Sequence, residues 1–377
     1  MESASLLVIG AGPYGVATAA RAVEQGIDTV VLGRPMSFWT DHMPAGMFLR
    51  SGVDWHLDAS GIHTFEAFLE DAGIARTDVD PVPISVFLEY AAWFVDEKRL
   101  TPRQDLVVDV THANGRFEVV TERGARIAAD AVVAAPGIAC FEALPEWAAR
   151  VPEHLASHTC DLVVFDAVRG ARVLVVGGRQ SAYEWAALLG EAGAERVDIV
   201  HRHEVPRFDR VSWKFVDPYL DETARVPGWW RHLDQTDRDA IDRQFWAAGR
   251  LTLEWWLSPR LTGERFHRWP RAWVVDVLDG PGDAEVTVTL STGDRVVADL
   301  ILYATGYQAR LPDVPYLRGV IDQLRTADGF PVLDESLQSS CAGLYFTGFS
   351  ATRDFGPFFG FTKGCPVAAE LVVTHLA

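Results

Sequence analysis

The stretch LLVIGAGPYGVATAARAVEQGIDTVVL, residues 6–32, decides the fold class of this protein. A short apolar run, a glycine turn, an alanine-rich segment ending near Gly26 and a second β-branched run predict a strand, a helix and a parallel strand. Gly10, Gly12 and Gly15 fill the pattern GxGxxG at the first junction. The first glycine allows the tight turn, the second lets the backbone approach a pyrophosphate, and the third lets the helix pack on the strand. We therefore predict a dinucleotide site with its phosphates at the helix N-terminus, the alternative being a turn that binds nothing.

The end of the second strand departs from the usual dinucleotide pattern. An acidic residue about 20 positions after the turn usually binds the ribose hydroxyl. Here the strand ends Val31-Leu32-Gly33-Arg34, without a carboxylate. We therefore expect the backbone of Gly33 or the side chain of Arg34 to make the ribose contact.

A second unit of the same kind, ARVLVVGGRQSAYEWAALLGEAGAERVDIVHR, spans residues 171–202. Its turn begins at Gly177 but has Arg179 where the second glycine belongs. Arg179 could bind phosphates through its planar guanidinium, which is the interpretation we favour, or it could be a surface arginine on a site that has lost its ligand. The strand ends His201-Arg202-His203, and a cationic end suits a 2′-phosphate. The sequence thus favours NADPH, with NADH as the alternative.

Composition and charge narrow the class of protein. The chain has 377 residues, of which 49% are hydrophobic and 23% charged, so we expect a folded protein of two or three domains. A formal net charge of -18 argues against nucleic acids and anionic membranes as partners. The four cysteines have no CxxC spacing, which leaves structural zinc and a dithiol redox centre without the usual sequence support, and we predict no metal ligands.

The sequence also bears on location. The N-terminus lacks the positive region of a secretory signal, and no stretch of about 18 uncharged apolar residues follows. We therefore expect a cytoplasmic protein, and the sequence predicts no particular oligomeric state.

The region between Arg202 and Asp299 is irregular and aromatic, and it contains eight of the 13 tryptophans. Such clustering could line a pocket for a flat ligand, but it more commonly forms the core of a helical insert. After it, residues 285–307 alternate apolar and polar residues as hairpin strands do. A buried strand, a loop rich in Gly and Phe, and a closing helix from about Pro366 complete the chain.

Several motifs together resemble two-domain flavoprotein monooxygenases, over nearly the whole chain. The branch that the sequence most resembles contains FAD-dependent urate hydroxylase, flavin-containing monooxygenases and lysine or ornithine N-hydroxylases. The resemblance implies an α/β fold of two Rossmann-like dinucleotide-binding domains, the second inserted in the first. It implies an FAD-binding domain of residues 1–150 and 299–377, and an NADPH-binding domain of residues 151–298 with a Trp-rich insert at about 203–273. The motifs that carry it are APG at 135–137, GLYFTG at 343–348, GRPMSFW at 33–39, FLRS at 48–51, SAYE at 181–184, ATGY at 304–307 and DFGPF at 354–358.

The resemblance also implies which residues surround the cofactors. For FAD these are Gly10, Gly12, Pro13, Tyr14, Gly15, Gly33, Arg34, Trp39, Leu49, Arg50, Ser51, Trp55, Val107, Ala135, Pro136, Gly137, Gly348, Asp354 and Phe355. For NADPH they are Gly177, Arg179, Gln180, Ser181 and Arg202, and Thr305 and Gly306 complete the cofactor set. The catalytic candidates are Arg50, Asp54 and Arg353, with His56 and Asp354 as further polar groups, although each also has a purely structural interpretation.

The activity that the resemblance implies is a monooxygenation. NADPH reduces FAD, dioxygen adds at the flavin C4a carbon, and the hydroperoxide passes one oxygen atom to nitrogen, carbon or sulfur of a small molecule. The Baeyer–Villiger fingerprint is not intact, since His158 lacks its partner residues, and disulfide reductases are set aside because no cysteine pair is suitably spaced. An oxidase or reductase that does not use nicotinamide and a non-catalytic flavin-binding protein remain the alternatives.

Overall fold

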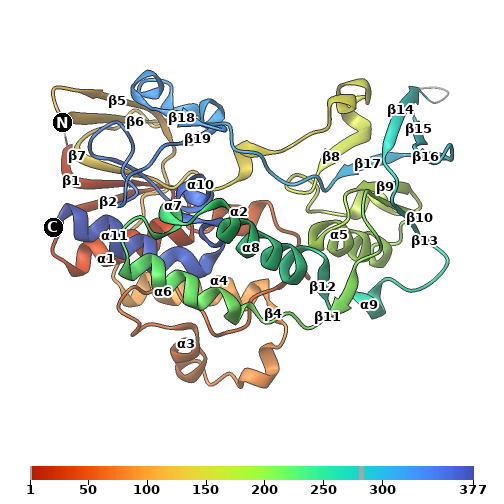
Figure 1. The fold of residues 1–377 in the computed structure, drawn as a ribbon, viewed down its shortest axis with the longest axis horizontal. Coiled ribbons are helices and arrows are strands. Elements are labelled where there is room, and N and C mark those ends of the chain that lie inside the picture. The colour runs from red at the N-terminus through yellow and green to blue at the C-terminus, as the bar shows by residue number, and fades with distance from the viewer. Residues whose placement is uncertain (1, 280–283) are drawn as a thin grey trace.

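The computed structural model describes residues 2–279 and 284–377, which form two lobes, each built on its own sheet (Figure 1). In the first sheet β2, β1, β7 and β20 are parallel neighbours, whereas β5 and β6 extend the sheet antiparallel from β7. The long strand β7 pairs with β6 through its first half and with β20 through its second half. The strands are β1 (Glu2–Ile9), β2 (Thr29–Leu32), β5 (Val107–Ala113), β6 (Arg116–Thr121), β7 (Arg126–Ala134) and β20 (Leu344–Phe346).

Helix α1 (Pro13–Glu24) packs on the first sheet, and the closing helix α11 (Cys365–Leu376) packs beside α1. The buried face of α1 consists mainly of small residues, which let the helix approach the strands closely. At Gly15 a β-carbon would lie 1.8 Å from the carbonyl oxygen of Gly10, so only glycine fits there. The predicted strand–helix–strand unit at 6–32 is confirmed.

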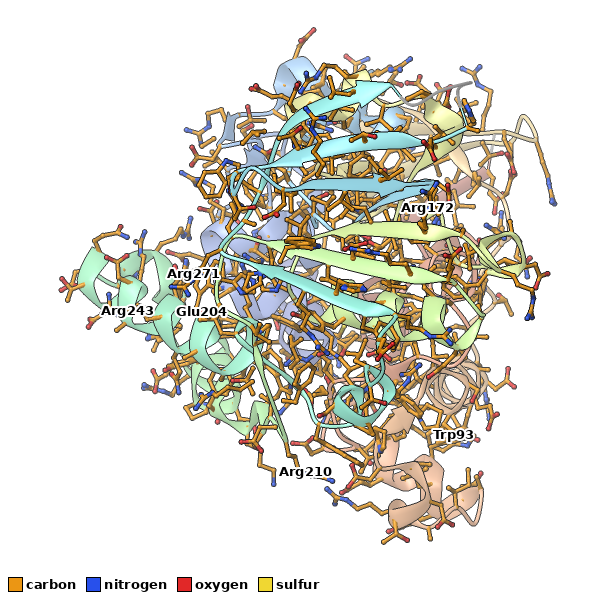
Figure 2. The ribbon with its side chains drawn as sticks, turned by 90° about the vertical axis from the view of Figure 1, so that its right-hand side faces the viewer. Trp93, Arg172, Glu204, Arg210, Arg243 and Arg271 are labelled. Atoms are coloured by element: carbon orange, nitrogen blue, oxygen red, sulfur yellow. The ribbon has the colours of Figure 1, made fainter. Side chains whose placement is uncertain are left out.

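The second lobe contains a fully parallel sheet in the order β13-β10-β9-β17-β8 (Figure 2). Alternate residues face opposite sides, so Val173 and Val175 pack against helix α5, whereas Leu174 packs against the antiparallel strands β14, β15 and β16. Arg172 ties β9 to this second layer by bonding Asp299 and Glu285. The elements are β8 (Ala156–His158), β9 (Arg172–Val176), α5 (Gln180–Glu191), β10 (Arg196–His201), β13 (Phe266–Pro270), β14 (Val274–Asp279), β15 (Val286–Leu290), β16 (Arg295–Ala298) and β17 (Leu300–Tyr303).

The aromatic region after β10 packs largely against the first lobe. Trp213, Trp230 and Phe245 are buried in the first core, whereas Phe208 and the last part of the region, around Trp256, pack in the core of the second lobe. The tryptophans are therefore shared between two cores, and Trp246, Trp255 and Trp273 lie exposed. The helices here are α6 (Asp217–Arg225), α7 (Trp229–His232) and α8 (Gln235–Phe245), followed by a short π-helix at Trp246–Arg250.

Two Rossmann-like units, the second inserted in the first, confirm the predicted fold class. We propose a revised domain division, because β17 pairs with β9 and the chain thus returns to the first lobe after Tyr303 and not at 299. Residues 213–245 belong with the first lobe in this division, because their apolar side chains pack there. The remaining elements are α2 (Ser37–Asp41), α3 (Phe65–Asp71), α4 (Ile84–Glu97), α9 (Leu257–Arg260), α10 (Thr352–Phe355), β3 (Phe48–Leu49), β4 (Val82–Pro83), β11 (Arg207–Asp209), β12 (Thr252–Glu254), β18 (Thr326–Ala327) and β19 (Phe330–Pro331).

Within residues 2–279 and 284–377, no helix combines the length and the apolar character that a membrane crossing needs.

Candidate functional site

The first glycine turn lies at the carboxyl ends of β1 and β7. Gly10 has φ +104°, and a β-carbon there would lie 2.3 Å from the carbonyl oxygen of Ala135. Gly12 is the N-cap of α1, and nothing lies within 4 Å of a β-carbon placed on it. The turn is therefore closed behind Gly10 and open in front of Gly12, at the positive end of a 12-residue helix. This arrangement fits a pyrophosphate.

The second glycine turn repeats this geometry. Gly177 has φ +145°, and a β-carbon there would lie 2.3 Å from the carbonyl oxygen of Ala304, which follows β17 as Ala135 follows β7. Arg179 is the N-cap of α5 and so takes the place of Gly12. Its guanidinium carbon lies 4.2 Å from the ring centre of Trp246. The guanidinium carbon of Arg250 lies 5.0 Å from the same ring centre. The space that is open in the first turn is thus filled by a side chain in the second.

Positive charge collects at the second turn. Partial desolvation, together with the charges of Arg250 and Arg202, lowers the pKa of Arg179 to about 10. Among the residues that the structure describes, no ion pair involves any of these three arginines. Unpaired guanidinium groups beside a helix N-terminus fit a phosphate or pyrophosphate anion.

The loop before α11 closes the first site from the carboxyl end of β20. The Tyr14 hydroxyl lies 2.6 Å from the carbonyl oxygen of Phe359, which ties the glycine turn to this loop. Gly348 has φ +70°, and a β-carbon there would lie 3.2 Å from the Tyr14 ring. The hydroxyls of Thr347 and Ser350 are buried and have no hydrogen-bond partner among the described residues. Orphaned buried hydroxyls call for a ligand, and a flavin with its many acceptors suits them.

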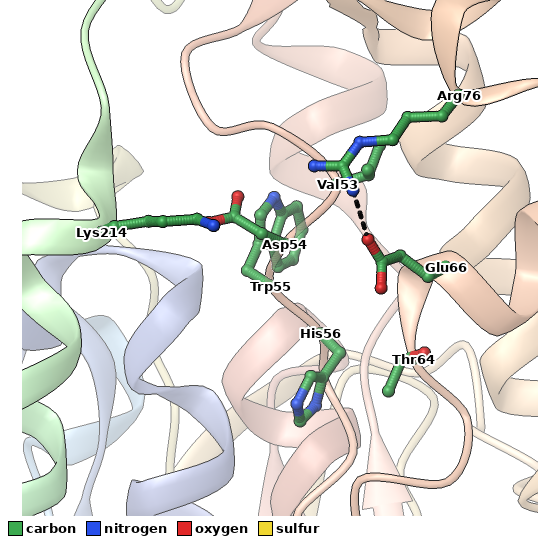
Figure 3. A pocket seen from close by; sticks show the side chains of 8 residues that line it. All are labelled: Val53, Asp54, Trp55, His56, Thr64, Glu66, Arg76 and Lys214. Atoms are coloured by element: carbon green, nitrogen blue, oxygen red, sulfur yellow. Dashed lines mark hydrogen bonds and ion pairs between the residues drawn. The ribbon is translucent and has the colours of Figure 1, made fainter.

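An open pocket of about 240 Å³ lies beside the loop that follows β3 (Figure 3). Its wall contains Trp55 and His56, whose Nε1 and Nδ1 atoms are buried without a partner within the described chain. Burial lowers the pKa of His56, so the imidazole is neutral near pH 7. Lys214 points toward Asp54, which also lies 3.5 Å from Lys363. The lining residues are Val53, Asp54, Trp55, His56, Thr64, Glu66, Arg76 and Lys214.

The side chains of the other two catalytic candidates, Arg50 and Arg353, already bind other groups of the protein. The Arg50 guanidinium binds Glu254 at 3.1 Å and the carbonyl oxygens of Thr252, at 2.9 Å, and Gly249. Arg353 donates to Asp354 at 2.7 Å, and Asp354 accepts the backbone N–H of Leu333 at 2.8 Å. Of the three predicted catalytic residues only Asp54 lines the pocket, and we propose structural roles for Arg50, Arg353 and Asp354.

The remaining cofactor candidates of the first lobe divide into backbone and packing positions. Arg34 pairs with Asp41, the Trp39 ring lies 4.5 Å from that of Phe87, and Leu49 is buried in β3. Phe355 is buried, and its ring centre lies 5.1 Å from that of Phe359. Ser51 lies in the loop after β3, and Val107 is the first residue of β5. Around the glycine turn lie Pro13 at the start of α1, Gly33 with φ +132°, and Pro136 and Gly137 in the turn after β7.

In the second lobe, Gln180 donates to Glu184 and accepts the backbone N–H of Glu254. Ser181 lies exposed in the first turn of α5. Thr305 donates to the carbonyl oxygen of Ala143, and Gly306, with φ +80°, has open space beside its α-carbon. These positions follow β9 and β17 and so lie at the edge of the sheet that carries the second turn.

Sequence reasoning missed several residues of these sites, among them Trp246, Arg250, Thr347 and Lys363. Trp246 and Arg250 come from the irregular aromatic region, where no periodic pattern places them beside a glycine turn. Thr347 belongs to the quoted GLYFTG motif, which could have identified it as a site residue. Lys363 lies in a loop that carries no recognisable motif.

We expect Arg50→Met to loosen the aromatic region without acting on chemistry directly. The change leaves Glu254 and two carbonyl oxygens without their donor, and burial already raises the pKa of Glu254 and lowers that of Arg50. Hydrogen exchange should accelerate at residues 246–254, and Glu254→Gln should accelerate it in the same segment. Lost activity with unchanged exchange would instead indicate a catalytic Arg50.

Comparison with known proteins agrees with this geometry. Residues 7–225 match the family model described as pyridine nucleotide-disulphide oxidoreductase. A ferredoxin–NADP reductase of Cupriavidus metallidurans is 31% identical over 212 residues, 53% of this chain and 52% of the relative. An FAD-dependent urate hydroxylase of Xanthomonas campestris is 28% identical over 173 residues, 44% of this chain and 35% of that protein. The chain thus matches about half, or less, of the length of these curated relatives.

Among solved structures, the ornithine N-hydroxylase of Kutzneria sp. 744 has a TM-score of 0.82 and 16% identity, with 99% of both chains covered. At this identity the likeness supports the fold, and it extends over both lobes. The family model covers more than half of the chain and includes both glycine turns. This protein is therefore a member of the pyridine nucleotide-disulphide oxidoreductase family.

Proposed function

We propose that the protein is an NADPH-dependent flavoprotein monooxygenase, which uses FAD and dioxygen to place one oxygen atom on nitrogen or carbon of a small molecule. The observation that carries this proposal is the pair of glycine turns with the same geometry, one at the carboxyl ends of parallel strands in each sheet. The urate hydroxylase relative and the ornithine N-hydroxylase, solved with reduced FAD and NADP+, support it. All four cysteines are free, so none of them forms an internal redox disulfide in this structure.

In this proposal the first turn holds FAD. The open face of Gly12 and the N-terminus of α1 receive the pyrophosphate, and Thr347 and Ser350 supply hydrogen bonds that the protein does not use itself. Bound FAD would supply hydride acceptance and oxygen activation. The chain's own task is to orient the substrate and exclude water, and we assign this task to the pocket that Asp54, Trp55 and His56 help to line.

The second turn holds NADPH in this proposal. Because Arg179 fills the space that a second glycine would leave open, its guanidinium must bind the pyrophosphate from the side and leave Trp246. Arg202 follows β10, where the ribose of a dinucleotide lies, and its charge favours a 2′-phosphate.

We expect Arg202→Ala to weaken selection of NADPH. A charge-assisted hydrogen bond contributes about 1.5–3 kcal/mol, so the KM for NADPH in flavin reduction should rise about tenfold or more. The KM for NADH, which lacks the phosphate, should stay nearly constant. Arg271→Ala is the control, because Arg271 is exposed and pairs with Glu204. Equal losses for both nucleotides would contradict the assignment.

A second candidate function is ferredoxin–NADP reduction. The 31% identical relative bears that name, and the activity would use the same two nucleotide sites. The two functions differ in the electron acceptor, which is dioxygen in the first and an iron–sulfur protein in the second.

The deciding experiment begins with the spectrum and the cofactor of the purified protein. NADPH added without oxygen should bleach the flavin band, and persistent colour would instead favour an enzyme that does not use nicotinamide. In air, NADPH oxidation that rises with small amines or heterocycles supports the monooxygenase. NADPH oxidation that needs added ferredoxin, and proceeds without oxygen, supports the reductase. A colourless protein that cannot take up FAD would refute both functions.

A further inference from the structure

Cys160 lies at the centre of a cluster of metal-binding side chains, at the carboxyl ends of β8 and β17. Two sets of three, His42 with Cys160 and Asp161, and Glu142 with His158 and Cys160, each have their ligand atoms within 4.8 Å of one another. His42 comes from the end of α2 in the first lobe, and Glu142 comes from the connection that leads to the second. The cluster therefore joins three separate segments of the chain.

Several polar groups converge on the Cys160 sulfur. The Cys160 sulfur lies 2.8 Å from a carboxylate oxygen of Glu142 and 3.2 Å from Nδ1 of His158. Nδ1 also accepts the backbone N–H of Cys160 at 3.3 Å, so its one lone pair is directed toward this residue. The single thiol proton can serve only one of the two acceptors. The Tyr307 hydroxyl also hydrogen-bonds the sulfur, so three polar side chains meet at Sγ.

The surroundings of the cluster hold its side chains in place. The Tyr307 ring contacts the His158 ring edge-on at 5.3 Å, and the Phe38 ring stacks on His42 at 5.4 Å. His42 Nδ1 bonds the carbonyl oxygen of Cys160 at 2.8 Å. His158 and Cys160 are almost fully buried, whereas Asp161 is exposed and leaves an approach from solvent. Such outer contacts orient metal ligands and raise affinity.

We propose that Glu142, His158 and Cys160 bind a divalent cation of borderline softness, zinc above all, with Asp161 as the fourth ligand. Thiolate, imidazole and carboxylate are the three ligand types that zinc takes in proteins. The Asp161 carboxylate already lies 3.9 Å from the sulfur, on the exposed side. A cation here would take the place of the thiol proton between these side chains, and it would fasten the connection after the first sheet to the end of β8. The proposal is independent of the electron acceptor.

The test is metal binding to the purified, chelator-stripped full chain. Zinc alone should bind one equivalent per chain by calorimetry, and it should release about one proton at pH 7, because the Cys160 thiol must ionise. Cobalt should give thiolate-to-metal absorption and tetrahedral bands to the red of the flavin band. Cys160→Ser and His158→Gln should each weaken zinc binding by more than the about 10- to 100-fold that loss of an outer partner costs.

Matched controls keep this test decisive. Cys341→Ser removes a thiol that also lies near a histidine, 3.4 Å from His112 Nδ1, but it should leave zinc binding unchanged. Should Cys160→Ser fail to fold, Glu142→Gln keeps the size of the side chain and should still weaken binding. Absence of zinc binding by the wild-type chain, or equal binding by wild type and Cys160→Ser, would overturn the proposal.

Discussion

Gly12→Val is expected to give a folded protein that purifies without FAD. Gly12 has φ -76° and ψ -176°, which any residue can adopt, and a β-carbon there meets nothing within 4 Å. Valine should therefore fit the chain itself but fill the space that the pyrophosphate needs. Flavin absorbance per chain should fall to near zero while far-ultraviolet circular dichroism stays native. Flavin reduction by NADPH would be lost with the cofactor.

Two further variants test the reasoning behind this result. Arg179→Val changes the equivalent position of the second turn, so the protein should keep its flavin and lose affinity for NADPH. Gly15→Val should instead abolish folding, because its side chain would enter the Gly10 carbonyl. A Gly12→Val protein that purifies with a full complement of FAD would refute the placement of the pyrophosphate.

Lys98→Met is expected to be among the most destabilising single changes away from the two sites. Lys98 is buried at the end of α4 and bonds Asp58 at 2.6 Å and Ser60 at 3.2 Å, with Glu24 as a further partner. Asp58 is 1% exposed, so the change would leave a buried carboxylate without its cation. Breaking such a pair costs about 3–5 kcal/mol. The free energy of unfolding, measured with denaturant on the first transition, should fall by this amount.

Arg76→Met is the control for this prediction. Arg76 and Glu66 pair at 2.6 Å, but both side chains are more than half exposed, so the loss should stay below about 1 kcal/mol. Equal losses in the two variants would contradict the argument from burial.

The same network predicts how stability depends on pH. Burial alone would raise the pKa of Asp58, but hydrogen bonds from the His63 N–H, Lys98 and Ser60 outweigh it and hold the pKa well below the ordinary 3.8. A carboxyl with a depressed pKa in the folded state contributes stability above its unfolded pKa and loses it as the pH falls. As the pH falls below about 5, the free energy of unfolding of the wild type should therefore decrease by more than that of Asp58→Asn. Parallel curves for both proteins would exclude this contribution.

The two parallel units could be predicted from the sequence because their signals are local. In residues 6–32 the strand, the turn and the helix follow each other directly, and the steric reasons for Gly10 and Gly15 act within a few residues. The second unit is equally local, and its Arg179 was recognised as the departure that matters. The fold class followed from these two stretches and the terminal motifs.

The parts that escaped prediction depend on contacts between distant segments. Arg50 lies in a motif that suggested a cofactor role, yet its partners are 199 to 204 positions later in the chain. The pairing of β17 with β9, on which our proposed domain division rests, could not be predicted either, since an apolar run of four residues does not show which sheet it joins. No local pattern could reveal that Trp246 covers Arg179.

The docking of residues 213–245 onto the first lobe has a practical consequence for anyone who would express either half alone. Cutting the chain at 151 and 298 would carry off Trp213, Trp230 and Phe245 with the excised piece. The first-lobe fragment would then expose the hydrophobic surface that these residues cover, and the second-lobe fragment would carry an unpacked hydrophobic segment. Both fragments should therefore aggregate. A first-lobe fragment that retains residues 213–245, with a short linker in place of the second sheet, should instead remain in solution.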